Sequence, residues 1–327
     1  MDRKMKAIVN TAPGKLEWLD VPMPEPAIGQ VRIRIGACGI CATDLEMISG
    51  WTRTGYPSIP GHEWSGTVDA LGQGVEPSLL HQRCVAENVL GDGGEVGFEH
   101  PGGYGQYLLT EARHVHVLPD PMPFATAAMI EPLAVSVRAM SRLGSLPRAV
   151  LVFGDGPIGL LITALLSRAG VREVVLVGGH ASRLLAGMSL GATLTLNYHD
   201  FKDTIAASIR EATKTDFRAV IEASGNPQAL TAGLELVSRE GSCLMIGDYG
   251  LSRADFLWNT ILLREITLLG TNASGGAWPR AVEFAIQGEI PLDRLISHHV
   301  PAADFAVGVE LSRHHKDETL KVVLDWA

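Results

Sequence analysis

The first third of the chain alternates apolar and polar residues in short runs that proline and glycine interrupt. Residues 31–35 alternate strictly, which predicts a half-buried strand. Breaker residues are dense in the segments 22–26 and 91–94. We therefore expect a β-rich region over residues 1–120. A stretch with few breakers at 125–142 predicts a helix after it.

Continuous apolar runs replace this alternation from residue 148 onward. The run at 149–153 predicts a strand that is buried on both faces, and the stretch 160–169 predicts a helix after it. Later apolar runs predict strands at 173–177, 219–222, 242–246, 266–269 and 321–324. Such alternation is typical of an α/β fold with a doubly wound parallel sheet. The expected domains are residues 144–270 for this sheet, and residues 1–143 with 271–327 for the β-rich part.

Composition narrows the class of protein. The 327 residues suffice for two domains, and 46% hydrophobic with 19% charged residues is ordinary for a globular protein. No run of about 18 apolar residues occurs, so no membrane span is expected, and the polar residues 1–6 predict a cytoplasmic protein. The net charge of −9, without a basic block, argues against nucleic-acid binding. Four scattered cysteines are too few for a disulfide scaffold.

A glycine-rich turn joins the predicted strand at 149–153 to the helix after it. Within its Gly-x-Gly-x-x-Gly pattern, Gly154 permits a tight turn, Gly156 lets the backbone approach a pyrophosphate, and Gly159 lets helix and strand pack closely. The helix N-terminus adds N–H groups for phosphates. The turn predicts a dinucleotide site, the alternative being an ordinary strand–helix turn. The candidate cofactor-binding residues are Gly154, Gly156, Pro157, Ile158 and Gly159, together with Ser224 after the strand at 219–222.

The end of the next strand bears on the choice between NAD and NADP. Sites for NAD usually carry Asp or Glu there, which accepts a hydrogen bond from the ribose 2′-hydroxyl. This chain has Gly178 and Gly179 instead, followed by His180, Ser182 and Arg183, which could bind a 2′-phosphate. The glycines leave room and no carboxylate repels the phosphate, so the segment predicts a preference for NADP, with NAD possible. The alternative is a relaxed site that accepts both, with Arg183 merely solvated.

Two short segments near the N-terminus supply the side chains of a zinc site. Cys41 offers a thiolate with Thr43 close by, and His62 and Glu63 offer an imidazole and a carboxylate. Such ligands, with one position left for substrate, are typical of a catalytic zinc. Alone, Cys41 would more often be a core residue, and Glu63 could lie outside the ligand shell.

Together these segments resemble the zinc-containing medium-chain dehydrogenases, such as alcohol, sorbitol, threonine and glucose dehydrogenases. The resemblance covers nearly the whole chain and rests on the segments 39–44, 60–63, 102–107, 131–133 and 154–159. It implies a GroES-like β-rich catalytic domain plus a Rossmann domain. It also implies hydride transfer between a small-molecule secondary alcohol and NAD(P), by a homodimer or homotetramer in which the strand within 256–271 often pairs across the dimer axis. The alternative for that strand is an internal position.

Residue by residue, the resemblance implies that Cys41 and His62 bind zinc, and that Glu63 or Glu131 adds a carboxylate directly or through water. Glu131 begins a Glu-Pro-Leu motif whose Glu-Pro form resembles the polyol and sugar branch of the family. We therefore expect a polyol, sugar or cyclitol as substrate. The alternative for Glu131 is a carboxylate that merely suits the first turn of a helix.

The resemblance also implies a proton path, and here the chain departs from the family. Asp44 would orient the zinc-binding histidine, and Thr43 would hydrogen-bond the substrate hydroxyl and pass its proton on. Many relatives end this relay on a histidine where this chain has Glu46, so the relay ends on Glu46 or in water.

A second departure concerns the metal content. Relatives often bind a structural zinc through four cysteines in a lobe, but the corresponding segment 83–103 contains only Cys84. We expect one catalytic zinc and no structural zinc.

Two other functions stay open on the sequence. A zinc-free NADPH-dependent enone or quinone reductase shares the fold but lacks the Cys-His-Glu set. A redox-inactive NADPH-binding protein would need neither Thr43 nor Asp44.

Overall fold

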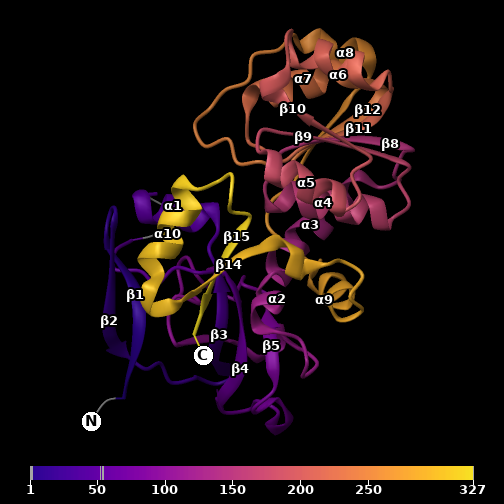
Figure 1. The fold of residues 1–327 in the computed structure, drawn as a ribbon. Coiled ribbons are helices and arrows are strands. Elements are labelled where there is room, and N and C mark those ends of the chain that lie inside the picture. The colour runs from indigo at the N-terminus through magenta and orange to yellow at the C-terminus, as the bar shows by residue number, and fades with distance from the viewer. Residues whose placement is uncertain (1–2, 52, 54, 327) are drawn as a thin grey trace. The chain divides into compact units, whose positions relative to one another are not determined.

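The computed structural model describes residues 3–51, 53 and 55–326 (Figure 1). Contacts within the chain divide it into two compact units, which are described separately. Unit 1 comprises Met1–Glu131, Ala281–Gly288 and Leu292–Ala327, and unit 2 comprises Pro132–Arg280 and Glu289–Pro291. The predicted fold class is confirmed. The domain boundaries predicted at 143/144 and 270/271 stay a prediction.

Unit 1 is built on a seven-stranded sheet in the order β14-β15-β3-β4-β5-β7, with β6 paired to β3 and a separate two-stranded sheet of β1 and β2. The yellow C-terminal strands thus complete a sheet begun by the N-terminal strands (Figure 1). Its elements are β1 (Lys4–Ala12), β2 (Lys15–Pro22), β3 (Gln30–Gly39), α1 (Ala42–Ser49), β4 (Glu63–Leu71), η1 (Pro77–Leu79), β5 (Arg83–Ala86), β6 (Tyr107–Glu111), η2 (Ala112–His114), β7 (Val115–Val117), α2 (Phe124–Ala128), η4 (Leu292–Leu295), β14 (Ile296–Pro301), η5 (Ala302–Asp304), α10 (Phe305–His314) and β15 (Lys321–Asp325).

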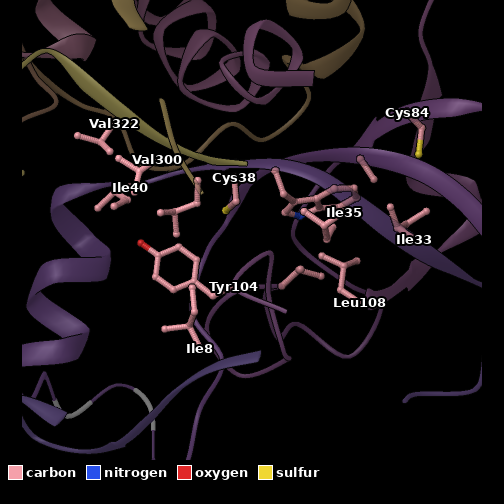
Figure 2. Close-up of a cluster of buried hydrophobic side chains, with 14 of the residues drawn as sticks. Ile8, Ile33, Ile35, Cys38, Ile40, Cys84, Tyr104, Leu108, Val300 and Val322 are labelled. Atoms are coloured by element: carbon pink, nitrogen blue, oxygen red, sulfur yellow. The ribbon is translucent and has the colours of Figure 1, made fainter. Parts of the chain in front are cut away.

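The core of unit 1 lies on the sheet and is drawn in Figure 2. Side chains from β1, β3, β6, β14 and β15 converge there, and Tyr104 lies among them with none of its surface exposed. Strand β3 contributes more of these residues than any other strand, because apolar side chains on one face of a strand recur at every second position, as at Val31, Ile33 and Ile35. The strand predicted at 31–35 is confirmed and extends over Gln30–Gly39.

The prediction of a single helix over 125–142 is wrong in one respect. The structure has two helices, α2 (Phe124–Ala128) and α3 (Ile130–Leu143), with Met129 between them. Pro132 explains the break, since its ring would clash with the carbonyl of Ala128 in a continuous helix. Pro132 instead occupies the first turn of α3, where a missing N–H costs nothing.

Unit 2 contains a six-stranded, all-parallel sheet in the order β10-β9-β8-β11-β12-β13. This is the strand order of the Rossmann fold. Its elements are β8 (Ala149–Phe153), α4 (Pro157–Arg168), β9 (Glu173–Gly178), α5 (Ala181–Ser189), β10 (Leu194–Asn197), η3 (Tyr198–Asp200), α6 (Ile205–Thr213), β11 (Phe217–Glu222), α7 (Pro227–Leu236), β12 (Val237–Met245), α8 (Trp258–Arg264) and β13 (Thr267–Gly270); α3 and α9 (Trp278–Ile286) contribute residues to both units.

Strand β8 is buried along its whole length, as predicted for 149–153. Helix α4 begins at Pro157, three positions before the predicted start, because proline fits the first helical position. Of the residues that the structure describes, no helix is long and apolar enough to cross a membrane. The cytoplasmic location stays a prediction.

Candidate functional site

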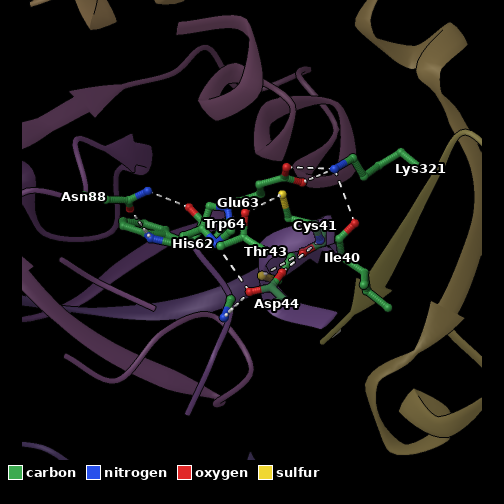
Figure 3. Close-up of polar contacts among 12 residues, drawn as sticks. Ile40, Cys41, Thr43, Asp44, His62, Glu63, Trp64, Asn88 and Lys321 are labelled. Carbon is green, nitrogen blue, oxygen red and sulfur yellow. Dashed lines mark hydrogen bonds and ion pairs between the residues drawn. The ribbon is translucent and has the colours of Figure 1, made fainter. Parts of the chain in front are cut away.

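Asp44 connects the two segments that carry the predicted zinc ligands. Helix α1 begins after Cys41, and the Cys41 N–H donates a hydrogen bond of 2.8 Å to Asp44 Oδ2. Asp44 Oδ1 accepts a hydrogen bond of 3.2 Å from the Gly61 N–H and lies 3.3 Å from His62 Nδ1. One fully buried carboxylate therefore holds both segments and orients the imidazole, as Figure 3 shows.

Three predicted ligands converge around this carboxylate. One ligand atom each of Cys41, His62 and Glu63 lies within 4.8 Å of the other two. His62 and Glu63 are buried, whereas Cys41 is partly exposed. A thiolate, an imidazole and a carboxylate with one open side are the donor types of a catalytic zinc, so these residues fit the metal.

Glu63 is also bound by a buried lysine that the sequence did not reveal. Both carboxylate oxygens of Glu63 lie 2.7 Å from Lys321 Nζ, which also donates to the Ile40 carbonyl at 3.3 Å (Figure 3). Burial lowers the pKa of Lys321, but Glu63 outweighs this and holds that pKa above its ordinary value. The ammonium therefore stays charged and compensates the carboxylate. Both residues begin strands of one sheet, Glu63 in β4 and Lys321 in β15, with β3 between them.

Glu131 lies outside this group of three but within electrostatic reach of it. It occupies the first turn of α3 and is partly buried. Burial raises the pKa of Glu131 to about 7, with the charge of His62 opposing the shift and that of Glu63 adding to it. Burial lowers the pKa of His62 in turn, but Asp44 and Cys41 outweigh this and raise it well above its usual value.

The two residues of the predicted proton path differ in exposure. Thr43 Oγ1 lies 3.7 Å from Cys41 Sγ, and Thr43 is partly exposed. Glu46 is exposed on α1. The structure therefore places Thr43 beside the metal ligands and Glu46 at the surface of the helix, and both relay roles stay predictions.

The glycines of the segment 102–104 serve to pack the ligand-bearing segment 59–61. Three backbone N–H groups, those of residues 102, 103 and 104, donate hydrogen bonds of 2.7–3.0 Å to carbonyls of residues 59, 61 and 60. A Cβ on Gly102 would lie 2.3 Å from the Gly61 carbonyl oxygen, so no larger residue fits. This motif therefore supports the site through the backbone.

The predicted dinucleotide turn forms a cradle in unit 2. Gly154 has φ of +109°, and a Cβ there would lie 2.9 Å from Ser224 N. A Cβ on Gly159 would lie 1.9 Å from the Gly154 carbonyl oxygen. Gly156 caps α4 without a side-chain hydrogen bond, Pro157 follows it, and a Cβ on Gly156 would meet open space. The first N–H groups of α4 are therefore offered as in pyrophosphate sites.

The space expected at the end of β9 is filled by the chain itself. A Cβ on Gly178 would lie 2.4 Å from Asp155 Oδ2, and one on Gly179 would lie 2.5 Å from the ring and hydroxyl of Tyr198. The expectation that the glycines leave room, with no carboxylate nearby, is therefore wrong. His180 directly precedes α5, and Arg183, inside that helix, is partly exposed. The preference for NADP itself stays a prediction.

Ser224, the remaining cofactor candidate, is tied to a buried acid. Its N–H donates 2.8 Å to Glu222 Oε1, and its hydroxyl donates to the same oxygen. Glu222 Oε2 accepts from the Gly225 N–H at 3.1 Å and from the Tyr249 hydroxyl. The fully buried carboxylate thus shapes the loop after β11, beside the glycine turn.

Comparison with protein families decides the class. A model described as an alcohol dehydrogenase GroES-like domain matches residues 27–120, and one described as a zinc-binding dehydrogenase matches residues 157–287. The chain belongs to the zinc-type medium-chain dehydrogenases. It is thus an NAD(P)-linked oxidoreductase of the alcohol dehydrogenase type.

Individual relatives match nearly the whole length of this dehydrogenase. It is 28% identical over 331 residues to a D-arabitol-phosphate dehydrogenase of Enterococcus avium, with 93% of each chain covered. It is 29% identical over 345 residues to an L-threonine 3-dehydrogenase of Stenotrophomonas maltophilia, covering 98% of this chain and 100% of that one. An alcohol dehydrogenase of Escherichia coli CFT073, solved with NADH, shares the fold with a TM-score of 0.92 at 23% identity over 99% of both chains.

In this dehydrogenase the segment 83–103 contributes to the site without a cysteine cluster. The Asn88 amide donates 2.8 Å to the His62 carbonyl and accepts 3.1 Å from the Trp64 indole (Figure 3). The ring of Phe98 lies 4.9 Å from that of His62. Sequence reasoning missed both residues, because an amide and an aromatic ring in a loop carry no spacing signal. The expected absence of a structural zinc stays a prediction.

Proposed function

We propose that this dehydrogenase oxidises a secondary alcohol group of a polyol, sugar or cyclitol, with NADP preferred over NAD and one zinc per chain. The observation that carries the proposal is the convergence of Cys41, His62 and Glu63 around Asp44. The Glu-Pro pair at Glu131 and the names of the two relatives, which refer to arabitol phosphate and threonine, support a small, polar, hydroxylated substrate.

The metal would be held by Cys41, His62 and Glu63. Glu63 suits this position although Lys321 binds it, because a carboxylate has about four lone-pair sites and can serve a cation on each side. When bound, zinc supplies Lewis-acid polarisation that lowers the pKa of the substrate hydroxyl, and the nicotinamide accepts the hydride. Glu131 would add a second carboxyl, directly or through water.

The chain's own residues would move the proton and hold the ligands. Thr43, beside Cys41, accepts the proton of the substrate hydroxyl and passes it outward to Glu46 or to water. Asp44 Oδ1, 3.3 Å from His62 Nδ1, would favour the tautomer that carries its proton on Nδ1. This would leave Nε2 to bind the metal. Asp44 already holds both ligand-bearing segments together.

The cofactor would lie with its pyrophosphate on the N-terminus of α4. Gly156 would let the backbone approach, and the first N–H groups of the helix, such as those of Ile158 and Gly159, would serve the phosphates. The preference for NADP rests on His180 and Arg183, the basic residues that follow β9.

The proposed assembly is a homodimer, or a homotetramer built from it, through α8 and β13. Strand β13 lies at an edge of its sheet. Large apolar side chains are exposed on α8, the helix before it, notably Trp258 at 75%, Leu262 at 70% and Leu263 at 66%. Edge strands and apolar patches of this kind are rarely left open. Light scattering of the Leu262→Glu, Leu263→Glu double variant should show monomers, and an unchanged mass would contradict this interface.

A substrate screen tests the reaction. Zinc-replete protein should oxidise members of a polyol, sugar and cyclitol panel with NADP, and a chelator should abolish the activity until zinc is restored. Turnover that a chelator leaves unchanged would support a zinc-free reductase instead. Binding of NADPH without turnover over the whole panel would support a protein that is not an enzyme.

A further inference from the structure

Asp155, between the first two glycines of the dinucleotide turn, is bound to the chain beyond β9. Its Oδ2 accepts hydrogen bonds from the Gly179 N–H at 2.9 Å and the His180 N–H at 2.8 Å. The same oxygen lies 3.1 Å from His180 Nδ1. A carboxylate oxygen accepts hydrogen bonds, so His180 carries a proton on Nδ1 and Nδ1–H donates a hydrogen bond to Asp155. Three donors from two residues thus meet one oxygen.

Asp155 lies too deep to take the place of the acid that usually binds the ribose. The side chain of an acid at position 178 would extend past its own Cβ, but Asp155 Oδ2 lies only 2.4 Å from that Cβ position. Asp155 is also buried. The carboxylate of Asp155 therefore lies where the side chain of a ribose-binding acid would begin, not where its carboxylate would be. Two backbone N–H groups donate hydrogen bonds to it there.

His180 is the group that this arrangement presents. Its side chain is 26% exposed, against 10% for Asp155. Because Nδ1 is committed to Asp155, Nε2 is the nitrogen through which His180 would bind a ligand oxygen. When Nε2 also carries a proton it donates to a phosphate oxygen, and such a charge-assisted hydrogen bond is roughly twice as strong as a neutral one.

We infer that Asp155 is a positioning residue that makes the dehydrogenase prefer NADP, by holding His180 as a donor to the 2′-phosphate. The inference rests on the proposed function, since it assumes that a dinucleotide binds the α4 turn. A carboxylate is thus present near the end of β9, contrary to the sequence-based expectation. It is that of Asp155, which is buried and hydrogen-bonded and acts through His180. Repulsion of the phosphate is limited because the two backbone N–H groups and the imidazole neutralise the carboxylate.

Binding measurements on the full-length protein test this without catalysis. Dissociation constants for NADPH and NADH are measured by fluorescence titration, and those for 2′,5′-ADP and 5′-AMP by competition. In Asp155→Asn, the amide oxygen still accepts the backbone N–H bonds but the charge is lost. We expect about tenfold weaker binding of NADPH and 2′,5′-ADP, and less than about threefold change for NADH and 5′-AMP.

Two further variants distinguish an effect of the Asp155–His180 pair on NADPH binding from a general effect on the fold. His180→Ala should weaken NADPH to a similar degree, and Asp155→Asn in that background should add less than about twofold, because the two residues act as a unit. Asp216→Asn is the matched control, because it removes the same charge at an exposed position. Asp216 precedes β11, at the amino ends of the parallel strands, whereas Asp155 lies at their carboxyl ends. It should leave all four constants unchanged.

Three results would overturn the inference. If Asp155→Asn weakens NADH and strengthens NADPH, Asp155 itself recognises the ribose. If both dinucleotides weaken equally with a fall in melting temperature, Asp155 only holds the turn. If neither changes, the pair has no role in selection. Failure of the proposed function is distinguishable, because the unaltered protein would then bind none of the four ligands.

Discussion

Two buried glutamates, Glu63 in unit 1 and Glu222 in unit 2, have their charges compensated in different ways. In unit 1 Glu63 meets a full positive charge on Lys321, and Asp44 faces the imidazole of His62. In unit 2 the carboxylate of Glu222 is surrounded by N–H and hydroxyl donors with no cation among its hydrogen-bond partners in the part of the chain described. The stability of a buried ion pair is sensitive to the loss of either partner, because the other charge is then left uncompensated. Where several N–H and hydroxyl donors surround a carboxylate, each compensates only part of its charge. A metal adds one more cation to the first arrangement and has no counterpart in the second.

The largest effect is expected at Lys321. In metal-free protein, Lys321→Met should lower the free energy of unfolding by about 3–5 kcal/mol, because Glu63 is left buried and unpaired. Denaturant titration measures it. The double variant Glu63→Gln, Lys321→Met should recover most of the loss, and zinc should shrink the effect of the single variant. A loss below about 1 kcal/mol would show that the pair is not a buried ion pair.

Two glycine variants separate fit from function in unit 2. Gly159→Ala should cost about 2–3 kcal/mol of stability, because its Cβ would overlap the Gly154 carbonyl oxygen. Gly156→Ala has open space for its Cβ and should change stability by less than about 0.5 kcal/mol, yet weaken dinucleotide binding about tenfold by blocking the backbone approach. Equal binding by Gly156→Ala and the unaltered protein would place the pyrophosphate elsewhere.

Glu222→Gln tests the dipole-paired carboxylate. The new amide group faces the Gly225 N–H or the Ser224 N–H, both donors, so one hydrogen bond is lost and the others weaken. We expect about 2 kcal/mol of destabilisation, less than for Lys321→Met. A loss as large as that at Lys321 would remove the distinction between the units.

The smallest effect is a pH dependence at Glu131. Its folded-state pKa of about 7 lies above the ordinary value of 4.5, so the folded protein holds the proton more tightly than the unfolded one. The stability of metal-free protein should therefore fall as pH rises from about 4.5 to about 7. Relative to the unaltered protein, Glu131→Gln should gain about 1 kcal/mol at pH 8 and nothing at pH 4.5. Stability curves that stay parallel across this range would contradict the shift.

Much of the architecture could be predicted because its signals are local. The buried run at 149–153 and the glycines after it identify a strand, a turn and a helix within twenty residues. The ligands Cys41 and His62 stand in two short segments that only needed to be brought together. The break between α2 and α3 was also readable in principle, since Pro132 excludes a helix through Ala128.

The remainder depends on contacts that the linear sequence does not display. Lys321 meets Glu63 across 258 positions, and only the pairing of β15 and β4 on either side of β3 brings them together. Asp155 occupies a variable position of the glycine pattern. It fills the space that a side chain at position 178 would need, because β8 and β9 are neighbouring strands in register. Both residues are charged and buried, which composition and periodicity do not anticipate.

Zinc content measured together with activity tests the account at its centre. Purified, zinc-replete protein should contain about one zinc ion per chain. Cys41→Ser should lose the ion and lower kcat/KM by about 100-fold or more. Cys38→Ala, which alters a fully buried thiol three residues away, should retain the zinc. An active protein without zinc, or a Cys41→Ser variant that keeps both its metal and its activity, would contradict the account.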